Sequence, residues 1–206
     1  MSDGAAVLNA ITPVSRETVK RLQCFEALLR RWQRKTNLVG PDTLPNFWTH
    51  HVADGAFVYA HAPETSAWTD IGAGAGLPGL VIAALAAGDG RNAQVDLVES
   101  NAKKCAFQRA AVLEMGLRDN AVTVGIHCRR IEEHRTRPDG VLTARALAPL
   151  ADLLDHTRTL GVDRGLFLKG DRHTEEIEAA RERHRFDVEI VPHPLRSGSV
   201  LLDVKL

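Results

Sequence analysis

The chain has 206 residues, a hydrophobic fraction of 44% and 26 basic side chains against 26 acidic ones. This composition excludes a globally disordered chain, and the length favours one domain with an extension. No apolar run approaches the roughly 18 residues of a membrane span and no signal peptide is recognisable, so we expect no membrane association. The three cysteines lack a CxxC spacing, which predicts reduced thiols in a cytoplasmic protein without a zinc cage.

Two helical segments are predicted before the first strand. Residues 1–14 are small and polar, and we expect them to be loosely held. Ser15 can cap a helix that continues to about Lys35, because apolar residues recur there at helical spacing. A second helical stretch is predicted over about 43–61. Its His50, His51 and Asp54 form a weak metal motif, so helix capping or hydrogen bonding in the core is the preferred interpretation and no metal is expected.

Short strands and helices alternate from residue 67 onward. The alternation predicts an α/β fold with a mainly parallel seven-stranded sheet that carries helices on both faces. No helix separates the last two strands, so they are expected to form an antiparallel pair. The predicted strands are 67–71, 93–98, 121–125, 140–144, 165–169, 186–191 and 200–206, and the predicted helices between them are 79–88, 101–116, 128–134, 149–160 and 173–184.

A glycine-rich turn connects the first of these strands to the first of these helices. Residues 70–79 read Asp-Ile-Gly-Ala-Gly-Ala-Gly-Leu-Pro-Gly. Glycines allow a ligand to approach backbone N–H groups closely, and the following helix start favours an anionic group. Residues 74–79 also satisfy the GxGxxG pattern, so a dinucleotide-dependent dehydrogenase must be considered.

Two observations argue against the dehydrogenase. The glycines begin before that pattern, with Asp70 built into the strand end, and the open sheet uses the residues after Glu99, which leaves no substrate domain. Glu99 ends the second strand, where a carboxylate can accept both hydroxyl hydrogens of a ribose. These features indicate an adenosine-containing ligand without choosing between NAD and S-adenosylmethionine.

Asp70-x-Gly72-x-Gly74-x-Gly76 followed by the acidic strand end resembles the class I S-adenosylmethionine methyltransferases, which have a Rossmann-like fold. The longer pattern resembles the RsmG (GidB) family, bacterial enzymes that methylate N7 of one guanine in small-subunit ribosomal RNA. The resemblance covers about residues 20–206. Its segments are 37–38, 51–54, 70–79, 98–107, 130–133, 143–147 and 168–170.

The resemblance implies S-adenosyl-L-methionine as cofactor and 16S ribosomal RNA, free or in the small ribosomal subunit, as partner of a monomeric RNA methyltransferase. It divides the chain into an N-terminal helical extension, 1–62, and a methyltransferase domain, 63–206. Arg145 would face the cofactor and the target base, and Lys169 would lie beside the same cleft as a second catalytic candidate. The implied cofactor-binding residues are Asp70, Gly72, Gly74, Gly76, Leu77, Glu99, Ile131, Glu132 and Arg145, with Glu99 at the ribose and Ile131 and Glu132 at the adenine.

The sequence departs from the family pattern at two places. Gly55 stands where the family often has a serine, and Ser197-Gly198-Ser199 replaces an arginine at the start of the last strand, with Arg196 just before. N7 of guanine is a neutral acceptor, so no general base is demanded. Candidate RNA-steering cations are Arg30, Arg31, Arg34, Lys35, Lys103, Lys104, Arg129 and Arg130.

Three alternatives stay open at this point. They are an NAD-dependent oxidoreductase, a methyltransferase of the same fold with another substrate, and a non-catalytic module that retains the fold. The intact glycine run, Glu99 and Arg145 argue against the last.

Overall fold

The computed structural model describes residues 3–118 and 121–206. Within them a seven-stranded sheet has the order β3-β2-β1-β4-β5-β7-β6. Its first five strands in this order are parallel, and β7 is antiparallel to both β5 and β6. The mainly parallel sheet with a closing antiparallel pair is thus confirmed. The strands are β1 (Ala67–Ile71), β2 (Ala93–Glu99), β3 (Val122–Cys128), β4 (Val141–Arg145), β5 (Arg164–Lys169), β6 (Asp187–Pro192) and β7 (Val200–Lys205).

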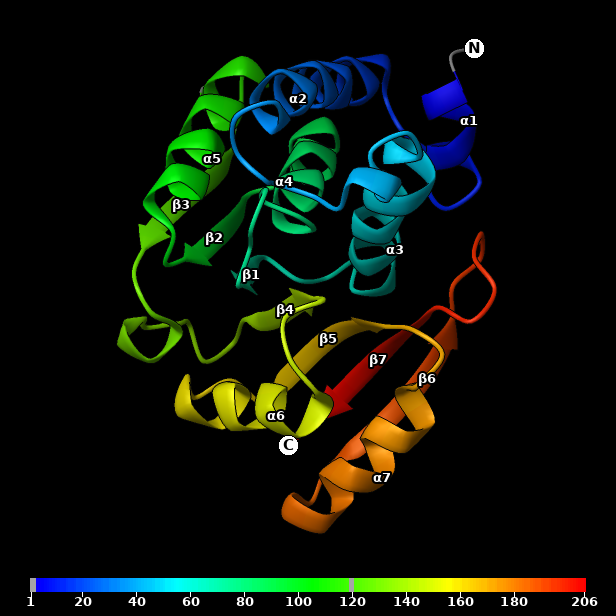
Figure 1. Ribbon diagram of the computed structural model, residues 1–206, viewed down its shortest axis with the longest axis vertical. Coiled ribbons are helices and arrows are strands. Elements are labelled where there is room, and N and C mark those ends of the chain that lie inside the picture. The colour runs from blue at the N-terminus through cyan, green and yellow to red at the C-terminus, as the bar shows by residue number, and fades with distance from the viewer. Residues whose placement is uncertain (1–2, 119–120) are drawn as a thin grey trace.

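Helices cover both faces of this sheet (Figure 1). The N-terminal helices gather with α4 and α5 on one face, and α6 and α7 lie on the other. No helix in the described part of the chain is long and apolar enough to cross a membrane. The α-helices are α1 (Asp3–Asn9), α2 (Arg16–Gln33), α3 (Ala53–His61), α4 (Gly79–Gly88), α5 (Ala102–Glu114), α6 (Leu150–Thr159) and α7 (His173–Arg183), with the 3₁₀ helices η1 (Pro41–Thr43) and η3 (Ile131–Glu133) and the π-helix η2 (Phe47–Val52).

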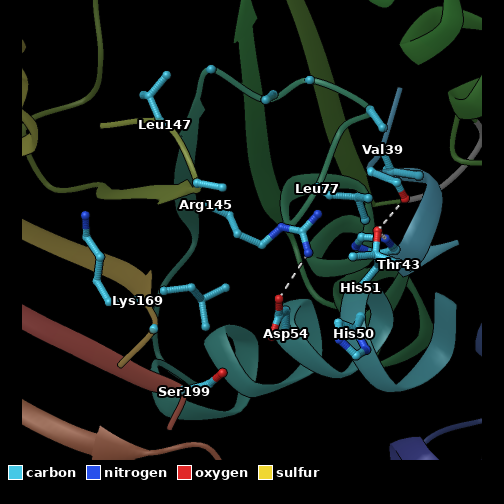
Figure 2. A pocket seen from close by; sticks show the side chains of 18 of the residues that line it. Val39, Thr43, His50, His51, Asp54, Leu77, Arg145, Leu147, Lys169 and Ser199 are labelled. Carbon is cyan, nitrogen blue, oxygen red and sulfur yellow. Dashed lines mark hydrogen bonds and ion pairs between the residues drawn. The ribbon is translucent and has the colours of Figure 1, made fainter. Parts of the chain in front are cut away.

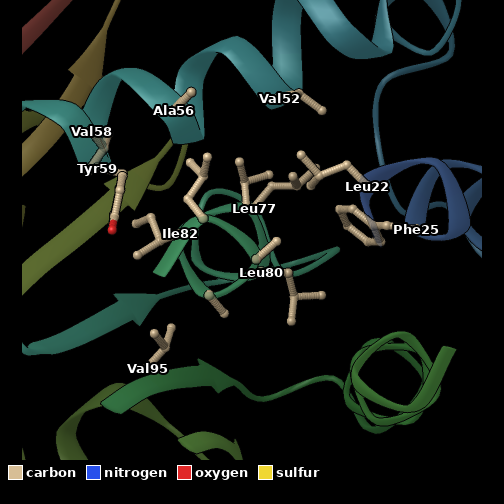
Figure 3. Packing of buried hydrophobic residues seen from close by; sticks show 14 of the residues in the cluster. Leu22, Phe25, Val52, Ala56, Val58, Tyr59, Leu77, Leu80, Ile82 and Val95 are labelled. Carbon is tan, nitrogen blue, oxygen red and sulfur yellow. The ribbon is translucent and has the colours of Figure 1, made fainter. Parts of the chain in front are cut away.

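Helix α4 lies at the centre of the larger hydrophobic core (Figure 3). Its sequence is apolar on every side, which is typical of a helix enclosed by protein. Leu80 and Ile82 are fully buried between α2, α3 and β2. Burial of one such side chain contributes about 1.5–3 kcal/mol. This packing fixes the first turn of α4 and therefore the glycine turn that leads into it.

The N-terminal segment differs from the prediction. Residues 3–9 form α1, in which Leu8 is fully buried and Gly4 packs against Trp48 so closely that a Cβ would meet the indole ring at 2.6 Å. For residues 3–9 the prediction of a loosely held segment was wrong, because the side chain of Leu8 enters the larger hydrophobic core, while residues 1 and 2 lie outside the described residues.

Two predicted helices were also wrong in extent. The stretch predicted over 43–61 is helical only from Phe47 onward, where η2 continues directly into α3, and Pro45, which lacks an N–H donor, lies in the break after η1. The helix expected over 128–134 is reduced to η3, because β3 continues to Cys128, which pairs with Glu99.

The close approach of α3 to α4 accounts for the first departure from the family pattern. A Cβ at Gly55 would lie 2.5 Å from the Cβ of Val81. Even a serine would therefore require the two helices to separate. Because α3 packs so tightly on α4, the residues of the N-terminal segment are held at fixed positions above the sheet.

Candidate active site

The glycine turn has a left-handed backbone at three positions. Gly72, Gly74 and Gly76 have φ angles of 62°, 56° and 79°, a region that other residues adopt only with strain. The N–H of Ala73 donates to the carbonyl of Val98 at 3.1 Å, which fixes the turn against β2. The sequence therefore needs glycine here for backbone shape as well as for space.

Asp70, at the end of β1, holds the glycine turn in place through a hydrogen bond to the start of α4. Its side chain is fully buried, and Oδ2 accepts the N–H of Gly79, the first residue of α4, at 2.9 Å. Burial raises the pKa of Asp70 to about 7, although the bond from Gly79 favours the ionised form. The carboxyl group thus lies at the positive end of the helix dipole. Its place under the turn makes Asp70 a support of the site rather than part of the cavity surface.

Glu99 and Gln108 hold Gly74 from two sides. The N–H of Gly74 donates to Glu99 Oε2 at 2.9 Å, and Gln108 Nε2 donates to the carbonyl of Gly74 at 2.9 Å. Glu99 Oε1 also accepts the N–H of Asn101 at 2.8 Å. A carboxylate offers about four acceptor sites, so Glu99 keeps capacity for a ligand hydroxyl. The sequence analysis did not identify Gln108. A polar residue on the buried, otherwise apolar face of α5 is the feature that could have indicated its role.

A cavity of about 760 Å³ opens beside the glycine turn (Figure 2). Its walls come from the turn, the β4–α6 connection, the end of β5 and the segment around residues 38–54. These elements meet here because parallel strands end at the same edge of the sheet. Of the predicted site residues, Gly72, Gly74, Leu77, Arg145 and Lys169 line the cavity, whereas Asp70, Gly76, Glu99, Ile131 and Glu132 lie outside its lining.

A buried carboxylate joins two arginines in the cavity wall. Arg145 extends from the end of β4 to Asp54 on α3, with Nη1 and Oδ2 3.1 Å apart (Figure 2). Arg196 donates to the other carboxylate oxygen, and His193 Nε2 lies 3.4 Å from it. Asp54 is only 2% exposed, whereas the two arginine side chains are 20% and 21% exposed. The wall therefore presents two guanidinium groups held by one anion.

The charge of Asp54 is stabilised by these partners. Burial alone would raise the pKa of Asp54, but the contacts with His193, Arg145 and Arg196 outweigh it and lower the pKa below its usual value. Sequence reasoning did not include Asp54 among the site residues. The feature that could have indicated Asp54 is its place in the segment 51–54, which resembles the N-terminal part of the family.

The two neighbouring histidines are uncharged. Burial, followed by the charge of Arg145, lowers the pKa of His51 to about 3, and its Nε2 lies 3.0 Å from Thr43 Oγ1. Burial and the charge of Arg196 also lower the pKa of His50. Both rings line the cavity, so they present neutral polar surface to a ligand.

Lys169 is already paired. Its ammonium group donates to Glu176 at 2.6 Å and to the carbonyl of Ala148 at 2.7 Å, and the side chain is 9% exposed. Glu176 also accepts the N–H of Leu150 at 2.8 Å. Lys169 therefore ties the β4–α6 connection to β5 and α7, which shapes the cavity wall.

Ile131 and Glu132 lie in η3, which follows β3, and in the sheet order β3 lies on the opposite side of β1 and its glycine turn from β4 and β5. The connection that leads to them is fixed to β2, because the N–H of Arg129 donates to the carbonyl of Glu99 at 3.2 Å. Ile131 packs against the smaller hydrophobic core, which lies between the sheet and helices α6 and α7, and Glu132 is exposed. The turn therefore separates two regions, the cavity with its arginines and the surface beside Glu99 and η3.

The fold is that of the class I S-adenosylmethionine-dependent methyltransferases, and its cavity lies at the strand ends where such sheets bind ligands. A methyltransferase structure from Geobacter sulfurreducens matches with a TM-score of 0.58 at 16% identity, over 98% of this chain and 94% of that chain. A SAM-dependent methyltransferase from Aquifex aeolicus matches with a TM-score of 0.58 at 12% identity, over 82% and 96%.

The chain belongs to the rRNA small subunit methyltransferase G (GidB) family, whose model matches residues 18–196. A relative of that description from Ruegeria sp. strain TM1040 is 39% identical over 100% of this chain and 98% of its own length. Another, from Methylobacterium nodulans, is 44% identical over 98% and 95%. The family resemblance is confirmed, and it favours methyl transfer over NAD-dependent oxidoreduction.

Proposed function

We propose that this chain transfers a methyl group from S-adenosylmethionine to N7 of a specific guanine in 16S ribosomal RNA of the small ribosomal subunit. The observation that carries the proposal is the cavity in which the glycine turn faces the Asp54–Arg145 pair. Membership in a family described as acting on small-subunit ribosomal RNA supports the substrate.

The residues beside the glycine turn fit the cofactor. Gly72, Gly74 and Leu77 would hold its methionine end, because all three line the cavity and the backbone at Gly74 lies open to a ligand. A Cβ at Gly74 would meet only the carbonyl of Gly72, at 3.8 Å, whereas the side chain of Leu147 lies against Gly72. Glu99 would accept the ribose hydroxyls with its remaining acceptor capacity. Ile131 and Glu132 would border the adenine, with Asp70 and Gly76 shaping the turn.

The chemistry requires orientation more than proton transfer. S-adenosylmethionine, when bound, supplies an activated methyl group on a sulfonium centre. N7 of guanine is a neutral acceptor, so no side chain has to remove a proton before attack. The chain contributes proximity and alignment, which can lower a barrier by roughly 7–11 kcal/mol in well-held pairs. Arg145 would orient the base, since an arginine N–H donor matches the O6 acceptor beside N7.

Lys169 and Asp54 would act as positioning residues in this proposal. Lys169 has its donors directed to Glu176 and Ala148, so it would hold the wall rather than contact RNA phosphate. Asp54 would hold Arg145 and Arg196 at one spacing. The family pattern has an arginine at the start of the last strand. In this chain Arg196, which precedes that strand, would take over the contact with Asp54.

The RNA would approach over cations beside the cavity and along the neighbouring sheet edge that leads to η3. Lys104 lines the cavity, Lys103 is its exposed neighbour, and Arg129 and Arg130 follow β3 at the same sheet edge. Arg31, Arg34 and Lys35 precede the residues 38–40 that line the cavity, and Arg30 is paired with Glu26. Neutralised phosphates release counterions, so RNA binding should weaken steeply as salt is raised.

The division into an extension, 1–62, and a methyltransferase domain, 63–206, is part of the proposal. The extension would complete the active site, because Val39, Thr43 and Asp54 belong to it and line the cavity. We propose that the enzyme works in the cytoplasm as a monomer, which size-exclusion chromatography with light scattering tests.

The proposal is tested by transfer of a labelled methyl group to unmodified small-subunit ribosomal RNA. We expect label in the RNA with the wild-type chain and none with Arg145→Ala, whose fold is verified by circular dichroism. Thermal-shift measurements should show stabilisation by S-adenosylmethionine and none by NAD. Label found only in protein or small molecules, or normal turnover by Arg145→Ala, would contradict the proposed activity or the proposed site, respectively.

A further inference from the structure

A cluster of one carboxylate and two imidazoles lies outside the cavity described above. Asp96 is on β2, His127 is on the adjacent β3, and His134 directly follows η3. One potential ligand atom from each residue lies within 4.8 Å of the other two. Asp96 and His134 are buried, with exposures of 7% and 3%. The proposed methyl transfer uses none of the three side chains.

The structure leaves space for this cluster. Gln94 Nε2 donates to Asp96 Oδ2 at 2.7 Å, while Asp96 Oδ1 lies 2.8 Å from His127 Nε2. Gly125 is paired with Asp96 in the sheet, and a Cβ there would come within 2.2 Å of Asp96 Oδ1 and 2.7 Å of His127 Nε2. The backbone of Gly125 is not left-handed, so backbone conformation does not require a glycine there. The space occupied by Asp96 Oδ1 and His127 Nε2 does.

His134 contributes an unsatisfied nitrogen. Its Nε2 is buried and finds no hydrogen-bond partner in residues 3–118 or 121–206. The His127 and His134 rings are neighbours, with centroids 4.5 Å apart. An imidazole nitrogen that carries no proton is a common metal ligand. A buried nitrogen of this kind calls for a ligand or a water.

A second cluster in the described residues lacks these properties. His61, Glu189 and Asp203 are also within reach of one another. Arg164, however, donates to both oxygens of Asp203, at 3.0 and 2.7 Å. The guanidinium already neutralises the carboxylate there, which makes this second cluster a matched control.

We propose that Asp96, His127 and His134 bind one divalent transition-metal ion, with Zn²⁺ as the best match. Two imidazole nitrogens and one carboxylate oxygen are a donor set that zinc accepts in tetrahedral geometry, with water in the fourth position. Zinc–ligand bonds of about 2.0–2.2 Å place tetrahedral ligands about 3.4 Å apart. The ion therefore replaces the 2.8 Å contact between Asp96 and His127 after a small separation.

The bound ion also requires one histidine tautomer and an outer partner. His127 must carry its hydrogen on Nδ1 so that the Nε2 lone pair faces the metal. Gln94 keeps the second oxygen of Asp96 in place, as outer hydrogen bonds commonly do for metal ligands. The consequence is structural, because the ion ties the β3–β4 connection, with η3, to β2.

The test uses the full chain after treatment with a chelator. Zn²⁺ is titrated by calorimetry, and Co²⁺ is titrated by visible absorption, which reports tetrahedral coordination. We expect one ion per chain, a dissociation constant in the micromolar range or below and a higher Tm with zinc. His134→Asn should weaken binding at least tenfold, whereas His61→Asn in the control cluster should change it less than threefold.

Asp96→Asn is the second test variant, because it keeps the side-chain shape if His134→Asn fails to fold by circular dichroism. It too should weaken binding at least tenfold. Absence of saturable binding would overturn the proposal, as would binding that Asp96→Asn leaves unchanged or that His61→Asn removes. These readouts do not involve methyl transfer, so they are decided separately from the proposed activity.

Discussion

Asp54→Asn is the most informative single substitution in the cavity wall. Asp54 is 2% exposed and contacts Arg145 and Arg196, each about one-fifth exposed. Hydrogen bonds between charged groups contribute about 1.5–3 kcal/mol, and loss of one partner of a buried ion pair costs about 3–5 kcal/mol. Solvent access to the arginines and the amide oxygen of Asn reduce this cost, so we expect the free energy of unfolding to fall by about 2–3 kcal/mol and the Tm by about 4–12 °C.

Activity and affinity should respond differently to Asp54→Asn. The arginines lose their common anchor, and a displacement of about 1 Å can reduce turnover roughly 100-fold. The glycine turn is held by Glu99 and Gln108 instead, so the Kd for S-adenosylmethionine should change less than threefold. The assays are steady-state methyl transfer, calorimetry and thermal unfolding. Asp89→Asn is the control, since Asp89 bonds to Tyr59 away from the cavity.

The pH dependence gives this prediction a second readout. The pKa of Asp54 is lowered in the folded state, so its contribution to stability is present above its unfolded pKa of about 3.9 and is lost as pH falls through the folded value. The Tm difference between wild type and Asp54→Asn should therefore be constant from pH 8 to 5 and shrink below about pH 4. Full turnover and an unchanged Tm in Asp54→Asn, or an equal loss of turnover in Asp89→Asn, would refute the reasoning.

Three further predictions concern other parts of the site. Glu99→Ala removes the acceptor for Gly74 and the proposed ribose contact, so calorimetry should show at least tenfold weaker S-adenosylmethionine binding; unchanged affinity would contradict the role of Glu99. His51 has a folded pKa of about 3 against about 6.5 unfolded, so the unfolded chain binds a proton first and stability falls as pH decreases from 6.5 toward 3. Urea unfolding should show that the free energy of unfolding falls less between pH 7 and pH 5 in His51→Gln than in the wild type. An equal fall in both would show that His51 is not the cause of the pH dependence. Ala146 has a left-handed φ of 52° directly after Arg145, so Ala146→Val should lower unfolding free energy by about 1–2 kcal/mol while Ala146→Gly does not; the same stability for both would show that the backbone there is unstrained.

Most of the fold could be predicted from local sequence patterns. The limits of β1 and α4 are those predicted, because an apolar strand, four glycines and an apolar helix follow one another within a short stretch. The antiparallel closing pair followed from the missing helix between the last two strands. The segments before residue 62 were less well predicted. The burial of Leu8 depends on packing with distant elements, whereas Pro45 is a local helix-breaking signal that the predicted helix over 43–61 did not take into account.

The partners within the site could not be predicted from spacing. Asp54 and Arg145 are 91 residues apart, and Asp54 and Arg196 are 142 apart. Gln108 reaches Gly74 across 34 residues. The family resemblance indicated that Arg145 faces the cleft, but the anion that holds it and the pairing of Lys169 with Glu176 depend on how helices pack over the sheet.

The central claim is methylation of N7 in one guanine, and chemical mapping of the modified RNA tests it most directly. Unmodified small-subunit ribosomal RNA, free and in ribosomal particles, is incubated with the chain and S-adenosylmethionine, and the strand is then cleaved at N7-methylguanine. The account predicts cleavage at one position with the wild-type chain and none with Arg145→Ala. Methylation at another atom or base, or cleavage that Arg145→Ala leaves unchanged, would contradict it.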